Sequence, residues 1–111
     1  MEQIVDLEAS PEYRALSVPL VSIAFDSPEV LAQAGAEFGV DTTPLLTDTD
    51  QSVSDSYDVL QWAVASGEPG HTFILVDEGG KIAWIRDYGV VENSMYVNPG
   101  EIASQVEEAL R

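Results

Sequence analysis

The chain has 111 residues, enough for one domain that buries roughly two-thirds of its unfolded surface. Twenty acidic residues against four basic ones give a formal net charge of −16, which repels phosphate backbones and anionic membranes, so we expect neither nucleic acid nor membrane as a partner. The chain contains no cysteine, which excludes disulfides, thiolate metal sites and thiol chemistry carried by the chain itself.

The surplus of acid has two interpretations. It is typical of salt-adapted proteins, in which dissolved ions screen the self-repulsion, and it is equally typical of an ordinary acidic soluble protein. No run approaches the roughly 20 apolar residues of a membrane span. The first six residues, Met-Glu-Gln-Ile-Val-Asp, lack the positive start and apolar stretch of a signal peptide, so we expect a cytoplasmic protein.

The first third of the chain predicts two helices and a strand. Residues 2–16 have helical apolar spacing, interrupted at Ser10-Pro11, since proline suits a first turn but not a helix interior. Residues 18–25 are a predicted strand with proline at its entry. A helix follows, with Ser27 as N-cap, Pro28 in its first turn and Gly39 at its C-terminal end.

The middle of the chain leads to a β-hairpin. Residues 44–47 are a short extended piece, and residues 52–64 a predicted helix with Val53, Tyr57, Leu60 and Val64 on one face, followed by a loop over 66–70. Two apolar runs, 72–76 and 81–85, flank a Gly-rich turn at 77–80, which is typical of a hairpin. Because the first run is apolar at every position from 73 to 76, we expect both of its faces to be buried.

A last helix begins at Asn98-Pro99 and runs to about Leu110. The resulting order, α-β-α-β-α-β-β-α, predicts an α/β sandwich that forms a single domain over residues 1–111.

Few residues offer chemistry. Asp48-x-Asp50-x-Ser52 superficially resembles a calcium loop, but the required glycine and glutamate are replaced by Val53 and Val59, so a helix cap is favoured. His71 is the only histidine; it is either an ordinary loop residue or part of a pocket, because no nucleophile or metal partner accompanies it. We expect no metal and no cofactor.

Three stretches together resemble the peroxiredoxins, the alkyl hydroperoxide reductase and thiol-specific antioxidant family. They are Val-Ser-Ile-Ala-Phe-Asp-Ser-Pro-Glu at 21–29, Pro-Leu-Leu-Thr-Asp at 44–48 with the helix that follows, and Gly-His-Thr-Phe-Ile-Leu-Val-Asp at 70–77 with Gly-Lys-Ile at 80–82. The agreement spans about residues 4–110 in the family's order.

The resemblance implies a thioredoxin-like three-layer sandwich that is incomplete at its N-terminus and ends in a β-hairpin and a helix. In the family the redox cysteine lies between the first core strand and the first helix, and this sequence begins after that position. We therefore assign no catalytic residue. His71, where thioredoxin relatives carry a cis-proline, Thr72, which matches the family pattern, and Tyr88 are candidates for a remnant of the redox pocket. Arg86 does not match the family's peroxidase arginine.

The absent strand would lie between residues 20–25 and 72–77, so its loss exposes two strand edges. The two strands can close the gap by pairing antiparallel, a second copy can pair with them, or another polypeptide can fill the place. We favour a homodimer among these three.

Three functions follow. The first is a cysteine-free redoxin-like domain, not catalytic by itself, that acts as a binding or assembly module. The alternative is the C-terminal part of a thiol-dependent peroxidase or thiol–disulfide oxidoreductase whose cysteine is encoded upstream. The third is a small-molecule binding domain with a pocket near His71, Thr72 and Tyr88.

Overall fold

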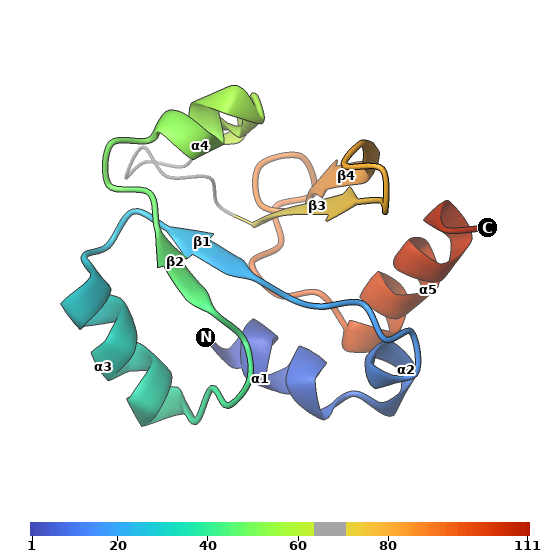
Figure 1. The fold of residues 1–111 in the computed structure, drawn as a ribbon, viewed down its shortest axis with the longest axis horizontal. Helices are drawn as coiled ribbons and strands as arrows, with labels where there is room; N and C mark the ends of the chain where they lie inside the picture. The colour runs from blue at the N-terminus through green and yellow to red at the C-terminus, as the bar shows by residue number, and fades with distance from the viewer. Residues whose placement is uncertain (64–70) are drawn as a thin grey trace.

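The structure is a computed structural model that describes residues 1–63 and 71–111 (Figure 1). The described part is a mixed α/β domain with the predicted order of elements. Its helices and strands are α1 (Glu2–Ala9), α2 (Pro11–Arg14), β1 (Ser22–Ala24), α3 (Pro28–Phe38), β2 (Leu45–Thr47), α4 (Ser52–Ser56), the 3₁₀ helix η1 (Val59–Trp62), β3 (Thr72–Val76), β4 (Ile82–Asp87) and α5 (Pro99–Ala109).

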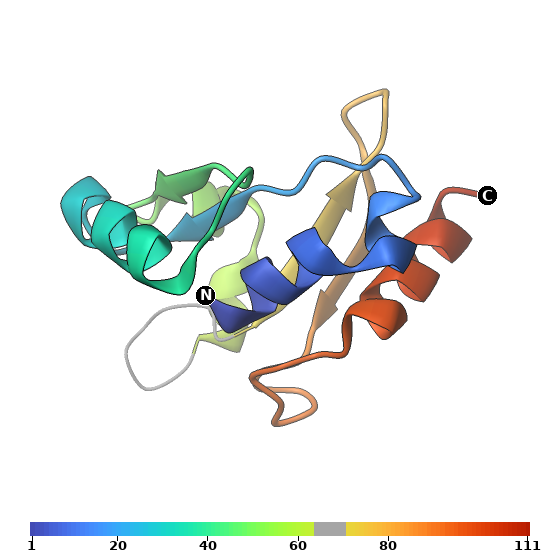
Figure 2. The ribbon, with the colours of Figure 1, turned by 90° about the horizontal axis from the view of Figure 1, so that it is seen from below.

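The strands form two separate two-stranded sheets within the described residues. β1 and β2 are parallel, with Ile23 opposite Leu46, and the crossover between them carries α3. β3 and β4 form the predicted antiparallel hairpin, with Leu75 opposite Trp84 and a register shift between Leu75 and Val76. In Figures 1 and 2 the strands follow the order β2, β1, β3, β4 across the molecule, and β3 runs opposite to β1.

Local capping sets the helix boundaries as the sequence predicts. The Ser10 side chain accepts a hydrogen bond from the Tyr13 backbone N–H, and this cap separates α1 from α2. Ser27 likewise caps α3 by accepting from the Val30 N–H. Gly39 ends α3 with φ of 78°, a left-handed conformation that glycine adopts without steric cost.

The main core lies between the hairpin and the helices α1, α2 and α5. Its buried members come from all of these elements and from the segment between β4 and α5; they are Leu7, Tyr13, Leu75, Tyr88, Val97, Ile102, Ala103 and Val106. Phe73 and Trp84 pack against this cluster. α3 packs separately on β2, where Gly35 allows close approach of the Leu45 side chain.

The predicted helix over 52–64 is wrong as a single element. α4 ends at Ser56, and η1 follows after Asp58, whose φ of 60° cannot continue a right-handed helix. Val53, predicted on the same face as Tyr57 and Leu60, is exposed. Val64 and the predicted loop at 66–70 lie outside the described residues.

Two predictions about the strands also need correction. The strand expected over 18–25 is regular only at Ser22–Ala24, and the second hairpin strand occupies Ile82–Asp87 instead of 81–85. The expectation that β3 is buried on both faces is wrong: Leu75 is buried, but Val76 is exposed. One face of β3 packs on the core, while no described helix covers the other completely.

No helix among the described residues is long and apolar enough to span a bilayer.

Candidate functional site

The three residues predicted as a remnant pocket do lie together, at the open end of the hairpin. His71 precedes β3, Thr72 begins it, and Tyr88 follows β4. The Tyr88 backbone N–H donates to the His71 carbonyl oxygen at 2.8 Å, which fixes the spacing of the two residues. The Phe73 ring packs edge-on against both the His71 ring (5.1 Å between centroids) and the Tyr88 ring (5.8 Å).

Tyr88 is a core residue rather than a pocket wall. It is only 2% exposed, and the guanidinium of Arg86 lies 4.9 Å from the centre of its ring, a cation–π contact. The buried hydroxyl makes no hydrogen bond of ordinary geometry within the described residues, although the Glu101 carboxylate is near enough to act on it. Burial raises the pKa of Tyr88 to about 12, with a smaller contribution from Glu101 and against the opposing effect of Arg86, so the hydroxyl stays protonated.

His71 faces Gln3, a residue that the sequence did not single out. The His71 Nε2 lies 2.9 Å from Gln3 Oε1, and because an amide oxygen only accepts, the neutral ring donates this bond. Burial of the ring and the nearby N-terminal ammonium lower the pKa of His71, while Asp87 opposes this change. A neutral histidine that donates to a buried amide has a structural role here.

Gln3 also holds the segment that leads to α5. Its amide donates to the Val97 carbonyl at 2.9 Å and accepts from the Val97 N–H at 2.7 Å. Gln3 is buried, so these bonds satisfy backbone groups that water does not reach. Periodicity could not reveal this contact, because a polar residue in an N-terminal helix ordinarily faces solvent.

Thr72 is engaged by Asp87, a second residue that sequence reasoning missed. The Thr72 hydroxyl donates to Asp87 Oδ1 at 2.9 Å across the hairpin, and the N–H groups of Val90 and Val91 donate to Oδ2. Burial alone raises the pKa of this carboxyl, but the hydrogen bonds from Val91, Thr72 and Val90 outweigh it and lower the pKa below its usual value. Asp87 therefore organises the turn after β4.

Glu8 performs the same task for the loop before β2. Its carboxylate accepts hydrogen bonds from the backbone N–H groups of Asp41, Thr42 and Thr43 and from both threonine hydroxyls. Burial acts to raise its pKa, but these bonds prevail and lower the pKa from 4.5 to about 2. Asp48 similarly accepts from the N–H groups of Val53 and Ser54 and so caps α4, which confirms the predicted turn and cap.

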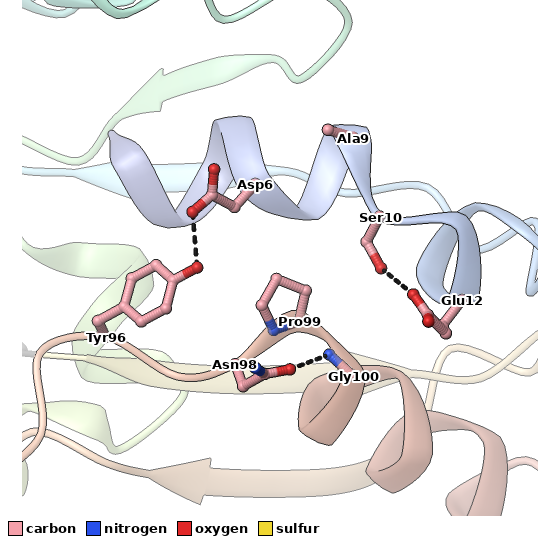
Figure 3. A pocket seen from close by; sticks show the side chains of 8 residues that line it. All are labelled: Asp6, Ala9, Ser10, Glu12, Tyr96, Asn98, Pro99 and Gly100. Carbon is pink, nitrogen blue, oxygen red and sulfur yellow. Dashed lines mark hydrogen bonds between the residues drawn. The ribbon is translucent and has the colours of Figure 1, made fainter.

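One hollow, of about 310 Å³, lies between α1 and the start of α5 (Figure 3). Its polar side chains already bond to neighbours: Tyr96 donates to Asp6 at 2.6 Å, and Ser10 donates to Glu12 at 3.1 Å. The bond to Asp6 raises the pKa of Tyr96 to about 12. The hollow is shallow and its hydrogen-bonding groups are satisfied, so nothing in it points to a ligand.

A second hollow, of about 490 Å³, lies beside the extended stretch that leads into β1. Its walls are mainly apolar and include Leu7 and Tyr13 from the helices and Val18, Leu20 and Val21 from that stretch. None of the three predicted pocket residues lines either hollow. The larger hollow thus lies beside the stretch at residues 17–21, ahead of β1.

The inner edge of β1 presents unpaired backbone groups. The Ser22 N–H donates to the Pro44 carbonyl, and the Ala24 carbonyl accepts from the Asp48 N–H, so both of these groups face β2. Since successive residues of a strand alternate, the N–H and C=O of Ile23 point the opposite way, toward the side on which β3 lies. Within the described residues β1 pairs only with β2.

The inner edge of β3 is arranged in the same way. The His71 carbonyl accepts from Tyr88, and alternation along the ladder then directs the backbone groups of Thr72 and Ile74 away from β4. β3 pairs only with β4 in the described part of the chain. The two strands therefore do not close the gap by pairing with each other, which removes one of the three arrangements expected from the sequence.

Among the residues that the structure describes, no three His, Asp or Glu side chains are grouped closely enough to hold a metal ion. Comparison with models of protein families, with curated proteins and with solved structures found no match to the chain.

Proposed function

We propose that this protein is a cysteine-free module of thioredoxin-like fold, similar in pattern to the peroxiredoxins, that binds or assembles with another polypeptide chain and catalyses no reaction alone. The observation that carries the proposal is the pair of separate sheets in the order β2, β1, β3, β4, with the inner edges of β1 and β3 unpaired within the described residues. A thioredoxin-like sheet has one further strand in that position. The proposal places the protein in the cytoplasm.

The chemistry of the described site supports a binding role. Glu8, Asp48 and Asp87 are ionisable groups whose pKa is lowered, and each uses its carboxylate to hold backbone N–H groups. His71 is committed to Gln3. None of them is poised to attack a substrate or to transfer a proton, and there is no thiol to act as a nucleophile.

A peroxide-consumption assay with a dithiol donor tests the absence of catalysis. We expect the rate to equal that of a buffer blank, because no residue can form a thiolate. Turnover above the blank that persists after repurification would contradict the proposal.

A second candidate follows from the same sheet geometry. If the strand that joins β1 and β3 also carries a cysteine, the assembled protein is a thiol-dependent peroxidase or oxidoreductase, and this chain is its C-terminal part. The reading frame upstream of Met1 distinguishes the candidates. An in-frame apolar strand followed by a Cys-x-x-Cys or Thr-x-x-Cys pattern supports the second, and a stop codon close to Met1 removes it.

A further inference from the structure

The directions of β1 and β3 define which segment can fit between their inner edges. β3 runs opposite to β1 (Figures 1 and 2), so a single inserted strand would lie parallel to one and antiparallel to the other. The backbone groups of Ile23 on one side and of Thr72 and Ile74 on the other face the inserted segment. Strand addition of this kind obtains affinity from main-chain hydrogen bonds.

The surroundings of the site require an apolar segment. The side chains of Val21 and Ile23 are each 48% exposed, although both lie in or next to a strand. The hollow of about 490 Å³ beside the entry to β1 has mainly apolar walls. Alternate side chains of an added strand point to opposite faces of the sheet, so one set can cover Val21 and Ile23, which are two residues apart and share a face.

The charge of the protein favours a basic occupant. The net charge is −16, and acidic residues follow both bordering strands: Asp26 after β1, and Asp77 with Glu78 after β3. An uncharged strand core flanked by Lys or Arg would meet opposite charge at both ends of the site.

A second copy of this chain fits the site less well. It carries the same charge of −16. Suppose that the β1 strands of two copies paired edge to edge. The β2 strand of the second copy would then lie beyond its β1, on the side where β3 and β4 of the first copy already lie. A single segment on a flexible connection meets neither obstacle.

We propose that the edges of β1 and β3 bind one extended segment of a different polypeptide that has an alternating apolar core and basic flanks. This inference rests on the proposed binding function and specifies its partner.

Amide hydrogen exchange with a synthetic peptide tests the proposal. The probe has an apolar core of about five Val and Ile residues with two lysines at each end. Two control peptides keep the core: one has glutamates in place of the lysines, and the other has proline at the centre, which cannot donate a ladder hydrogen bond. We expect the lysine peptide to slow exchange at the amides of Ile23 and Ile74 by about tenfold or more. The Ser22 amide, already bonded to Pro44, serves as the internal control and should change little.

Equal binding of all three peptides, or protection without any change at Ile23, would overturn the proposal. Sedimentation velocity of the chain alone separates this failure from failure of the proposed function. If the chain is a dimer that does not bind the lysine peptide, the proposed basic segment is contradicted, but the proposal that the protein assembles with another chain is not. A monomer that binds no peptide contradicts both.

Discussion

Gln3 joins parts of the chain that are 94 residues apart in sequence, and its amide satisfies both backbone groups of Val97 as well as the His71 ring. Because Gln3 is buried, its removal leaves those groups without water or protein partners. We expect Gln3→Leu, which nearly preserves volume, to lower the free energy of unfolding by about 2 to 4 kcal/mol. Urea denaturation measures this.

Gln33→Leu is the matched control, since the Gln33 amide makes its only described bond at an exposed position, to Glu37. It should change stability by less than about 0.5 kcal/mol. Equal effects of the two substitutions would show that the Gln3 contact does not hold the N-terminal helix to the segment before α5.

Glu8 gives the stability of the protein a specific dependence on pH. Its pKa is about 2 in the folded chain and 4.5 ordinarily, so its contribution is fully present above pH 4.5 and is lost as the pH falls toward 2. We expect Glu8→Gln to destabilise the protein at pH 7 and to flatten the fall in stability between pH 4.5 and 2. Thermal unfolding across this range measures both effects.

The control for Glu8 is Glu108→Gln, an exposed glutamate of α5. The two variants should differ clearly at pH 7 and converge at pH 2, where the Glu8 carboxylate is half protonated or more. If Glu8→Gln and Glu108→Gln were equally stable at pH 7, the five hydrogen bonds between Glu8 and the loop at residues 41–43 would make no net contribution to stability.

Among the elements, α3 has the boundaries most fully determined by local chemistry. Ser27 bonds the Val30 N–H, and Gly39 takes up the left-handed conformation at the other end. We expect Ser27→Ala to lower the free energy of unfolding by about 1 kcal/mol, because the cap is lost and no other described side chain replaces it. Ser104→Ala within α5 should be neutral or slightly stabilising, since alanine has the higher helix propensity. Comparable losses in both variants would rule out the cap as the cause.

The difference between local and long-range contacts explains which features could be predicted from the sequence. Caps act between residues two or three positions apart, so Ser10, Ser27 and Asn98 could be identified from their neighbours alone. The burial of β3 could not, because an apolar run predicts two covered faces only if other segments are present to cover them. The described elements leave Val76 45% exposed.

The candidate site was predictable in part for a related reason. His71, Thr72 and Tyr88 come together because a hairpin aligns its two ends, which the turn at residues 77–80 already implied. Their partners Gln3 and Asp87 were missed. Both are polar residues made buried by long-range packing, and neither apolar periodicity nor a motif marks such positions.

For the whole molecule, the net charge of −16 predicts a stability that depends on salt. Screening reduces repulsion among exposed carboxylates, so we expect the midpoint of thermal unfolding to rise between low and molar sodium chloride. A variant with Glu29→Lys and Glu78→Lys, both at exposed positions, should gain less from salt because it carries less net charge. No gain with salt in the parent chain would contradict salt adaptation.

If β1 offers an unpaired inner edge to a partner, amide exchange of the protein alone tests this most directly. The Ser22 N–H is bonded to Pro44, whereas the Ile23 N–H points toward the inner edge. We predict that Ile23 exchanges at nearly the rate of open backbone while Ser22 is protected, and that dilution leaves this difference unchanged. Protection of Ile23 equal to that of Ser22 at every concentration would show that the edge is already closed and would contradict the account.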